Sequence, residues 1–158
     1  MAKKKGSKAS KKAGRKGKAK AARARAKKPA AAKGASIEAL ARKIVRATSL
    51  PDFPFRDLYT EDAVSEEATG DVSRGISGLE EKMRRWEGMQ SATKWKARNV
   101  WCRGNTICIE WDADVTMRDG RTVKLREVGV HEIKGGKIAA ERFYYNPMQL
   151  APAPPATS

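Results

Sequence analysis

The feature that most constrains this 158-residue chain is a change in hydrophobic period after residue 93. From there apolar and polar residues alternate with a period of two, which is typical of β-strands with one buried face. The separators RGN, RDG and KGG favour tight turns, because Gly and Asn adopt turn conformations readily. The sequence therefore predicts a meander of four antiparallel strands over residues 94–103, 106–117, 121–134 and 137–145.

The second predicted strand shows the alternation most clearly. Successive side chains of a strand point to opposite faces of a sheet. One face is therefore apolar and the other mostly polar: Ile107, Ile109, Trp111, Ala113, Val115 and Met117 against Cys108, Glu110, Asp112, Asp114 and Thr116. We expect the apolar face to belong to the core.

The register of the first hairpin decides where Trp101 points. If the RGN turn sets Cys102 opposite Cys108, Trp101 points into the core together with Ile109. A shift of one residue turns a whole strand face over, so Trp101 would then point outward. An outward Trp101 would suggest a dimer surface.

Three segments before residue 93 carry helix signals. SIEALARKIVRA (36–47) has apolar residues at a spacing of 3.6, with Ser36 as the N-cap. DFPFRDLYTEDA (52–63) fits a short second helix that begins near Pro54. SGLEEKMRRWEGMQ (77–90) begins with a capping box of Ser77 and Glu80. Three helices followed by a meander predict an α+β domain, with the helices on one face of a curved, mostly antiparallel sheet and a pocket between the two layers.

The charge of the chain is concentrated at its N-terminus. Residues 1–34 contain twelve Lys, three Arg and no acidic residue, so they account for +15 of the net +16. Such a composition buries too little apolar surface to offset the entropy of ordering. We therefore expect a disordered basic tail over residues 1–35, a folded domain over 36–150 and a disordered Pro/Ala tail over 151–158.

Compartment and cofactors are constrained only by what the sequence lacks. It contains no apolar run that resembles a signal peptide or a membrane span. Cys102 and Cys108 are too few for a disulfide framework and suit free thiols in a reducing compartment. No residue cluster has metal-ligand spacing, and no glycine-rich phosphate loop is present. We expect a cytoplasmic or nucleoid-associated protein that uses neither metal nor cofactor.

Four stretches together resemble one family of domains: LYTEDAVSEEATG (58–70), RGISGLEEKMRRW (74–86), ICIEW (107–111) and VGVHEIKGGKIAAERFYYNP (128–147). They are similar to the SnoaL-like branch of the nuclear transport factor 2-like superfamily, and the resemblance covers residues 37–150. It implies a cone-shaped α+β barrel with a ligand pocket inside, commonly dimeric through the outer face of its sheet. Members include polyketide cyclases, ketosteroid isomerases, epoxide hydrolases, dehydratases and proteins without known chemistry, so the fold alone does not choose an activity.

Two titratable residues are candidates for catalysis. Glu67 resembles, by position, the general base of the isomerase members, and a carboxylate in an apolar cavity can exchange a proton near neutral pH. The alternative is a solvated acid in the loop TEDAVSEEATGD. His131 is the only histidine, and the alternation places it on the presumed inner face of its strand with Glu127 and Ile133. The alternative for His131 is a hydrogen-bonded structural residue.

The residues that we expect to line the pocket are Ile109, Trp111, Ala113, Glu127 and Tyr144. In the last strand, Arg142 and Tyr144 alternate with Glu141 and Phe143, and the sequence leaves open which set faces inward. The chain also departs from the isomerase pattern. The first helix has no tyrosine, Gly129 stands where the isomerases have a protonated acid, and Asn146 stands where family members often have Asp. Steroid isomerisation is therefore not expected.

The basic tail resembles the Lys/Ala-rich tails of linker histones. It contains no aromatic residue, so it suits phosphate backbones and cannot read base edges with a fixed geometry. We predict that it binds DNA or RNA without sequence specificity; the alternative is a tail that only solubilises the protein. The predicted contact residues are Lys3, Lys4, Lys5, Lys11, Lys12, Arg15, Lys16, Lys18, Lys20, Arg23, Arg25, Lys27 and Lys28.

Three functional hypotheses remain at this point. The first is a pocket that binds a small, mostly apolar ligand, with proton transfer by Glu67 or His131. The second is a non-enzymatic nucleoid protein that dimerises through its cone, and the third is an adaptor that binds a protein partner. A cavity lined by Glu67, Trp111 and His131 would support the first hypothesis, and a cone filled with side chains would refute it.

Overall fold

The computed structural model describes residues 36–151. The predicted disorder of the two tails and the predicted nucleic-acid contacts lie outside these residues. The elements in chain order are α1 (Ile37–Ala47), α2 (Phe55–Leu58), β1 (Tyr59–Glu66), β2 (Val72–Arg74), α3 (Gly75–Met89), β3 (Gln90–Arg103), β4 (Thr106–Met117), β5 (Thr122–Lys134), β6 (Lys137–Tyr145) and the 3-10 turn η1 (Pro147–Gln149). No helix among them is long and apolar enough to cross a membrane.

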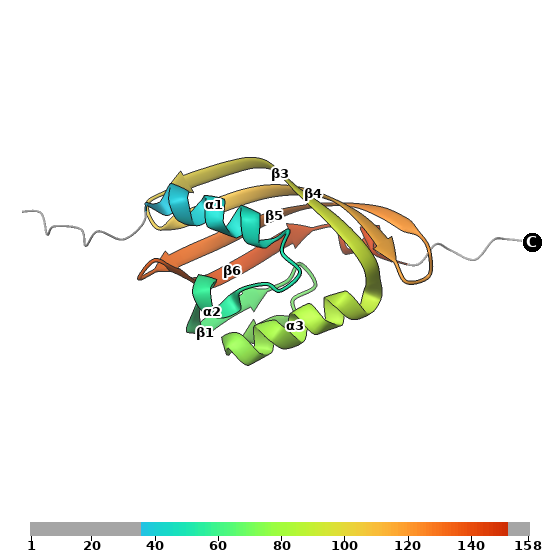
Figure 1. The fold of residues 1–158 in the computed structure, drawn as a ribbon, viewed down its shortest axis with the longest axis horizontal. Coiled ribbons are helices and arrows are strands. Elements are labelled where there is room, and N and C mark those ends of the chain that lie inside the picture. The colour runs from blue at the N-terminus through green and yellow to red at the C-terminus, as the bar shows by residue number, and fades with distance from the viewer. Residues whose placement is uncertain (1–35, 152–158) are drawn as a thin grey trace, which may run out of the picture. The chain divides into compact units, whose positions relative to one another are not determined.

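The six strands form one sheet in the order β2-β1-β6-β5-β4-β3 (Figure 1). All neighbours are antiparallel except β1 and β6, which pair in parallel. The four-strand meander predicted from the alternation is confirmed. The largest difference in bounds is in β3, which begins at residue 90 instead of 94 because it continues directly from α3.

Strands β1 and β2 were missed by the sequence analysis, which assigned residues 52–63 to a helix. Only one turn, α2, is helical there, and β1 occupies the following residues. Its sequence YTEDAVSE is rich in acidic residues that strands usually disfavour. β1 is paired on one side by β6, far along the chain, and no local pattern could indicate that pairing.

The helix ends follow local chemistry at one site and tertiary geometry at another. Ser36 caps α1 as predicted, since its side chain accepts a hydrogen bond from the N–H of Ala39. The prediction that Ser77 and Glu80 form a capping box is wrong, because α3 begins at Gly75 and Ser77 lies within its first turn. Gly75 has φ +67°, and a Cβ there would lie 3.2 Å from the carbonyl oxygen of Glu61. A sharp turn from β2 into α3 therefore starts the helix.

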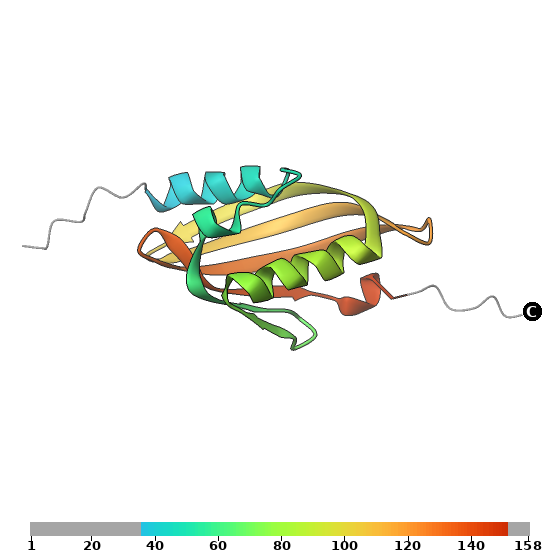
Figure 2. The ribbon, with the colours of Figure 1, turned by 60° about the horizontal axis from the view of Figure 1, so that its bottom comes forward.

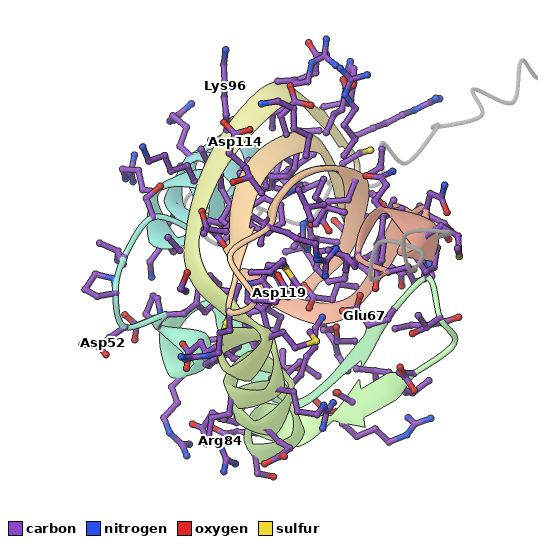
Figure 3. The ribbon with its side chains drawn as sticks, turned by 90° about the vertical axis from the view of Figure 1, so that its right-hand side faces the viewer. Asp52, Glu67, Arg84, Lys96, Asp114 and Asp119 are labelled. Carbon is purple, nitrogen blue, oxygen red and sulfur yellow. The ribbon has the colours of Figure 1, made fainter. Side chains whose placement is uncertain are left out.

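The three helices lie over one face of the curved sheet, as Figure 2 shows. Seen from the end in Figure 3, strands β3 to β6 curl so that this face is concave, while Lys96 and Arg84 point away from the enclosed side. The face of β4 that was predicted to be core is fully buried. Together with residues of α1, α3 and β1 it forms the hydrophobic interior that holds the layers together.

The register of the first hairpin places Trp101 on the outer face. Arg103 pairs with Thr106 across a two-residue turn in which Gly104 has φ +58°. Cys102 therefore faces Ile107, and Trp101 faces Cys108 with 53% of its surface exposed. The outward alternative is the one that the structure adopts.

Candidate functional site

A cavity of about 710 Å³ lies between the concave face of the sheet and the helices. Side chains of α3 line one side of it, and inward side chains of β3 to β6 line the other. Its surface is mainly apolar and aromatic, with a few polar groups that converge at one place. This combination is typical of small-molecule sites.

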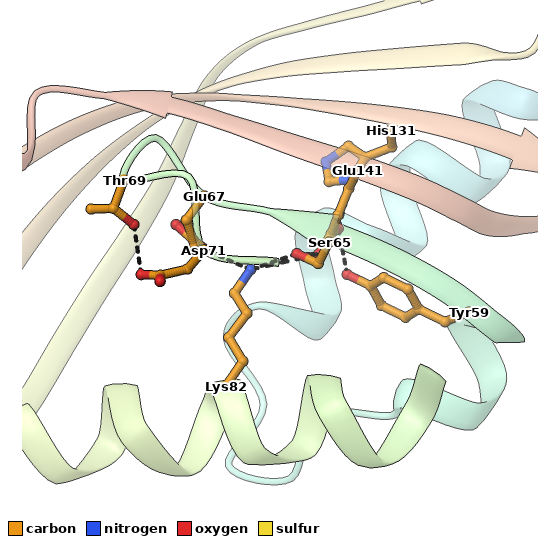
Figure 4. A network of polar contacts seen from close by, with 8 residues as sticks. All are labelled: Tyr59, Ser65, Glu67, Thr69, Asp71, Lys82, His131 and Glu141. Carbon is orange, nitrogen blue, oxygen red and sulfur yellow. Dashed lines mark hydrogen bonds and ion pairs between the residues drawn. The ribbon is translucent and has the colours of Figure 1, made fainter. Parts of the chain in front are cut away.

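The polar groups converge on the carboxylate of Glu141, which is 3% exposed (Figure 4). The Tyr59 hydroxyl donates to Oε2 over 2.7 Å, and the Ser65 hydroxyl donates to Oε1 over 2.8 Å. Burial by itself would raise the pKa of Glu141, but the hydrogen bond and charge of His131, the charge of Lys82 and the Tyr59 hydrogen bond together lower it. The carboxylate thus stays ionised inside the protein.

His131 binds the same carboxylate through one ring nitrogen. Its Nδ1 lies 3.1 Å from Oε2 of Glu141, and its Nε2 is buried with no hydrogen-bond partner among the described residues. Because Glu141 accepts a hydrogen bond, the neutral ring carries its proton on Nδ1 and its lone pair on Nε2. A Cβ on Gly129 would lie 3.0 Å from Nε2, so the absence of a side chain at Gly129 leaves room for the imidazole ring.

Lys82 joins the second candidate, Glu67, to this network. The Lys82 ammonium forms an ion pair with Glu67, donates to the Ser65 hydroxyl over 2.7 Å and lies 3.8 Å from Glu141. It also sits 4.2 Å from the centre of the Phe143 ring. One ammonium group is therefore shared between two carboxylates.

Glu127 lies at a separate position on the concave face. It is directly opposite Trp111 on β4 and Tyr145 on β6. Burial, and after it the charge of Glu67, raises the pKa of Glu127 to about 8. This carboxyl group is therefore mostly protonated at neutral pH, unlike Glu141.

The cavity brings together four of the residues proposed from the sequence, namely Glu67, Trp111, Glu127 and His131. Ile109 and Ala113 share the concave face but pack in the core beside the cavity. The prediction that Tyr144 lines the pocket is wrong, because this residue lies on the outer face of the sheet and is 56% exposed. The strand pleat instead turns Glu141, Phe143 and Tyr145 toward the cavity.

Lys82, Glu141, Tyr59 and Ser65 were missed as site residues. Lys82 could have been found, because it lies on the same helical stripe as Leu79, Met83 and Trp86 and interrupts an apolar face. Glu141 was one of two alternating sets whose orientation the sequence left open. Tyr59 and Ser65 belong to the missed strand β1. Among residues 36–151, no group of three or more His, Cys, Asp and Glu side chains could hold a metal ion.

Comparison with known proteins assigns the fold and the family. The family model described as SnoaL-like domain matches residues 37–141. The chain belongs to the SnoaL-like domain family. No curated protein matches the chain.

Solved structures support the same assignment of the SnoaL-like domain. A SnoaL-like protein from Mesorhizobium loti has 26% identity and a TM-score of 0.60, over 70% of this chain and 100% of that one. A nuclear transport factor 2-like protein from Cytophaga hutchinsonii has 20% identity and a TM-score of 0.57, over 73% and 94%. A ketosteroid isomerase-like protein from Catenulispora acidiphila, solved with trimethylamine, has 14% identity and a TM-score of 0.56, over 60% and 74%. The last two show the fold alone.

Proposed function

We propose that this SnoaL-like domain binds a small, mostly apolar molecule in its cavity and transfers a proton on it without a cofactor. The observation that carries the proposal is the His131 ring at the cavity wall, held through Nδ1 by a buried carboxylate, with an Nε2 that has no hydrogen-bond partner within residues 36–151. The lining of the cavity by Glu67, Trp111 and His131 supports ligand binding over a cone that serves only for dimerisation.

The arrangement suits general acid–base chemistry. Glu141 orients the imidazole and would stabilise the imidazolium that forms when Nε2 takes a proton, as a buried carboxylate does for a catalytic histidine in other enzymes. Glu67 is the second candidate base. It forms an ion pair with Lys82, and the Lys82 ammonium could stabilise negative charge that develops on a substrate oxygen.

Glu127 and His131 lie at opposite ends of the proposed site. They are four residues apart along β5, or ~13 Å, so both can contact one elongated ligand but not each other. His131 can return at another atom the proton that its Nε2 has taken, so the transfer balances without a second acid. Abstraction of a proton beside a carbonyl and its return at another atom is the chemistry of isomerases, cyclases and dehydratases.

Exchange of carbon-bound protons with D₂O tests this function directly. NMR would follow exchange in a panel of aryl ketones and 1,3-diketones, with the wild type and the His131→Asn variant. We expect wild-type acceleration of at least one compound and a loss of about 10²-fold or more in the variant. Equal rates in a folded His131→Asn variant would contradict the role of His131, and equal rates in Glu67→Gln would exclude Glu67.

We also propose that two copies associate through the outer face of the sheet. The exposed side chains of Trp101 and Tyr144 on this face support the proposal, because large aromatic residues are common at subunit interfaces.

For residues 1–34 we propose non-specific binding to DNA or RNA, which would hold a cytoplasmic protein near the nucleoid. The support is the charge of +15 in a segment without acidic residues. Because we place the ligand site in the domain of residues 36–151, we propose that the tail serves as a tether.

A further inference from the structure

The concave face carries a row of three side chains that the proposed proton transfer does not explain. Glu127 on β5 lies between Trp111 on β4 and Tyr145 on β6, each directly opposite it in register. All three line the cavity. Directly opposed residues in a sheet have Cβ atoms about 4.5–5.5 Å apart, so the carboxyl group is flanked on both sides by aromatic rings.

Two further tryptophans extend this aromatic wall. The Trp95 ring centre lies 5.9 Å from that of Trp111 at an interplanar angle of 75°, and the Trp86 ring lies 6.4 Å from Trp95 at 44°. All three tryptophans are among the residues that line the cavity. The faces of aromatic rings are negative, and tryptophan attracts cations most strongly.

The charges around the cavity leave Glu127 without a counterion. Five acidic and three basic side chains line the cavity: Glu67, Asp71, Glu87, Glu127 and Glu141 against Lys82, Arg85 and His131, which is hydrogen-bonded to Glu141. Lys82 is engaged by two of the carboxylates, and Arg85 pairs with Glu81 on its own helix. Within residues 36–151, Glu127 forms neither an ion pair nor a side-chain hydrogen bond. The cavity is thus acidic in a chain whose net charge is +16.

We infer that the ligand of this cavity carries an organic ammonium group, which binds between Glu127 and the faces of Trp111, Trp95 and Tyr145. The inference rests on the proposed function, because it names the ligand class of the same cavity. An anionic ligand would meet an excess of acidic side chains, whereas an ammonium group supplies the counterion that the Glu127 carboxylate lacks among the described residues. An ammonium with alkyl or aryl substituents matches both the carboxylate and the apolar, aromatic walls.

The charged groups that face Glu127 predict how the affinity varies with pH. They are Glu67 after β1, Lys82 on α3, and Glu141 and Tyr145 on β6. Because burial raises the pKa of Glu127 to about 8, an ammonium group must displace its proton at neutral pH. The affinity for a permanently charged ligand should therefore rise with pH, by up to about tenfold per unit below pH 8.

Choline and 3,3-dimethylbutan-1-ol test the inference, because they have the same shape and differ by the charge of one atom. NMR titration of the full chain at pH 8 should show choline bound at least about tenfold more tightly than the alcohol. Glu127→Gln should reduce this ratio to within about threefold. Glu132→Gln is the matched control, since it removes an exposed carboxylate of the same strand β5 that does not line the cavity, and it should leave the ratio unchanged.

A third probe, 2-naphthol, separates this inference from the proposed function. Equal affinity for choline and the alcohol, with 2-naphthol bound in the cavity, would overturn the ammonium inference and leave the ligand-binding function standing. Failure of all three probes to bind would overturn both. Choline affinity that is the same at pH 6 and pH 8 would also contradict the assignment to Glu127, whatever the behaviour of the variant.

Discussion

His131 and Glu141, on neighbouring strands, face each other inside the protein with Nδ1 3.1 Å from Oε2. Both residues are buried, with 2% of the surface of His131 and 3% of that of Glu141 exposed to solvent. Since Tyr59, Ser65 and His131 all donate to this one carboxylate, it organises one end of the cavity. The pair is therefore both a structural and a chemical feature, and its two roles can be separated by experiment.

Glu141→Gln should destabilise the fold by about 3–5 kcal/mol, because it leaves Lys82 and the His131 network without their buried anion. Urea unfolding measures the loss. Glu132→Gln is the matched control: it breaks the exposed ion pair with Arg142 on the same pair of strands and should cost about 1 kcal/mol or less. Equal losses in the two variants would show that the Glu141 network contributes nothing special to stability.

Glu127→Gln should stabilise the protein at alkaline pH. The folded-state pKa of about 8 lies above the ordinary value of 4.5, so folding holds a proton that the unfolded chain has released. The wild type therefore loses stability as pH rises from about 4.5 to 8, whereas the amide does not titrate. The stability gain of the variant should be near zero at pH 4 and exceed about 1 kcal/mol at pH 9. A gain that is independent of pH, measured by urea unfolding, would refute the raised pKa.

Gly129→Ala should create a steric clash with the imidazole ring of His131. The added Cβ would lie 3.0 Å from Nε2 of His131 and 3.2 Å from Cε1 of Phe143. Such overpacking costs about 1–3 kcal/mol and should shift the imidazole NMR signals. Gly88→Ala in α3 meets no atom within 4 Å and should instead stabilise the helix by up to about 1 kcal/mol. Unchanged imidazole signals in Gly129→Ala would contradict this packing.

Trp101→Lys should weaken self-association if the outer sheet face forms the dimer. The dissociation constant from analytical ultracentrifugation should rise at least about tenfold, because a charge replaces an aromatic contact. Met148→Lys is the control, since Met148 is an exposed apolar residue in η1, beyond the end of β6. A wild type that is monomeric at every concentration would refute the proposed interface.

Deletion of residues 1–34 should abolish retention on DNA at low salt and leave thermal unfolding of the domain unchanged. For the full chain, neutralisation of about seven phosphates gives a slope near −6 for log K against log salt on duplex DNA. Retention of the truncated protein on the same DNA column would show that the folded domain itself binds nucleic acid.

Local patterns predicted the meander well and the strand β1 badly. Alternation and turn residues are properties of short segments, so they identified β4 and β6 with the bounds that the structure has. β1 lies in an acid-rich segment whose local pattern favours a helix. In the sheet it lies between β2 and a parallel partner, β6, which is far along the chain. The same missed strand supplies Tyr59 and Ser65, so part of the site was missed with it.

The sequence by itself determined the sheet-forming half of the domain, the buried face of β4 and the inward position of His131, because each follows from the pleat and local residue types. Only the tertiary structure decided the partners of His131 and Glu67. Glu141, Lys82, Tyr59 and Ser65 come from two strands and a helix, and packing of α3 against the curved sheet brings them together. The state of a buried carboxyl likewise depends on which charges lie beside it in space. Glu141, with four partners, is ionised, whereas Glu127, with none among the described residues, holds its proton.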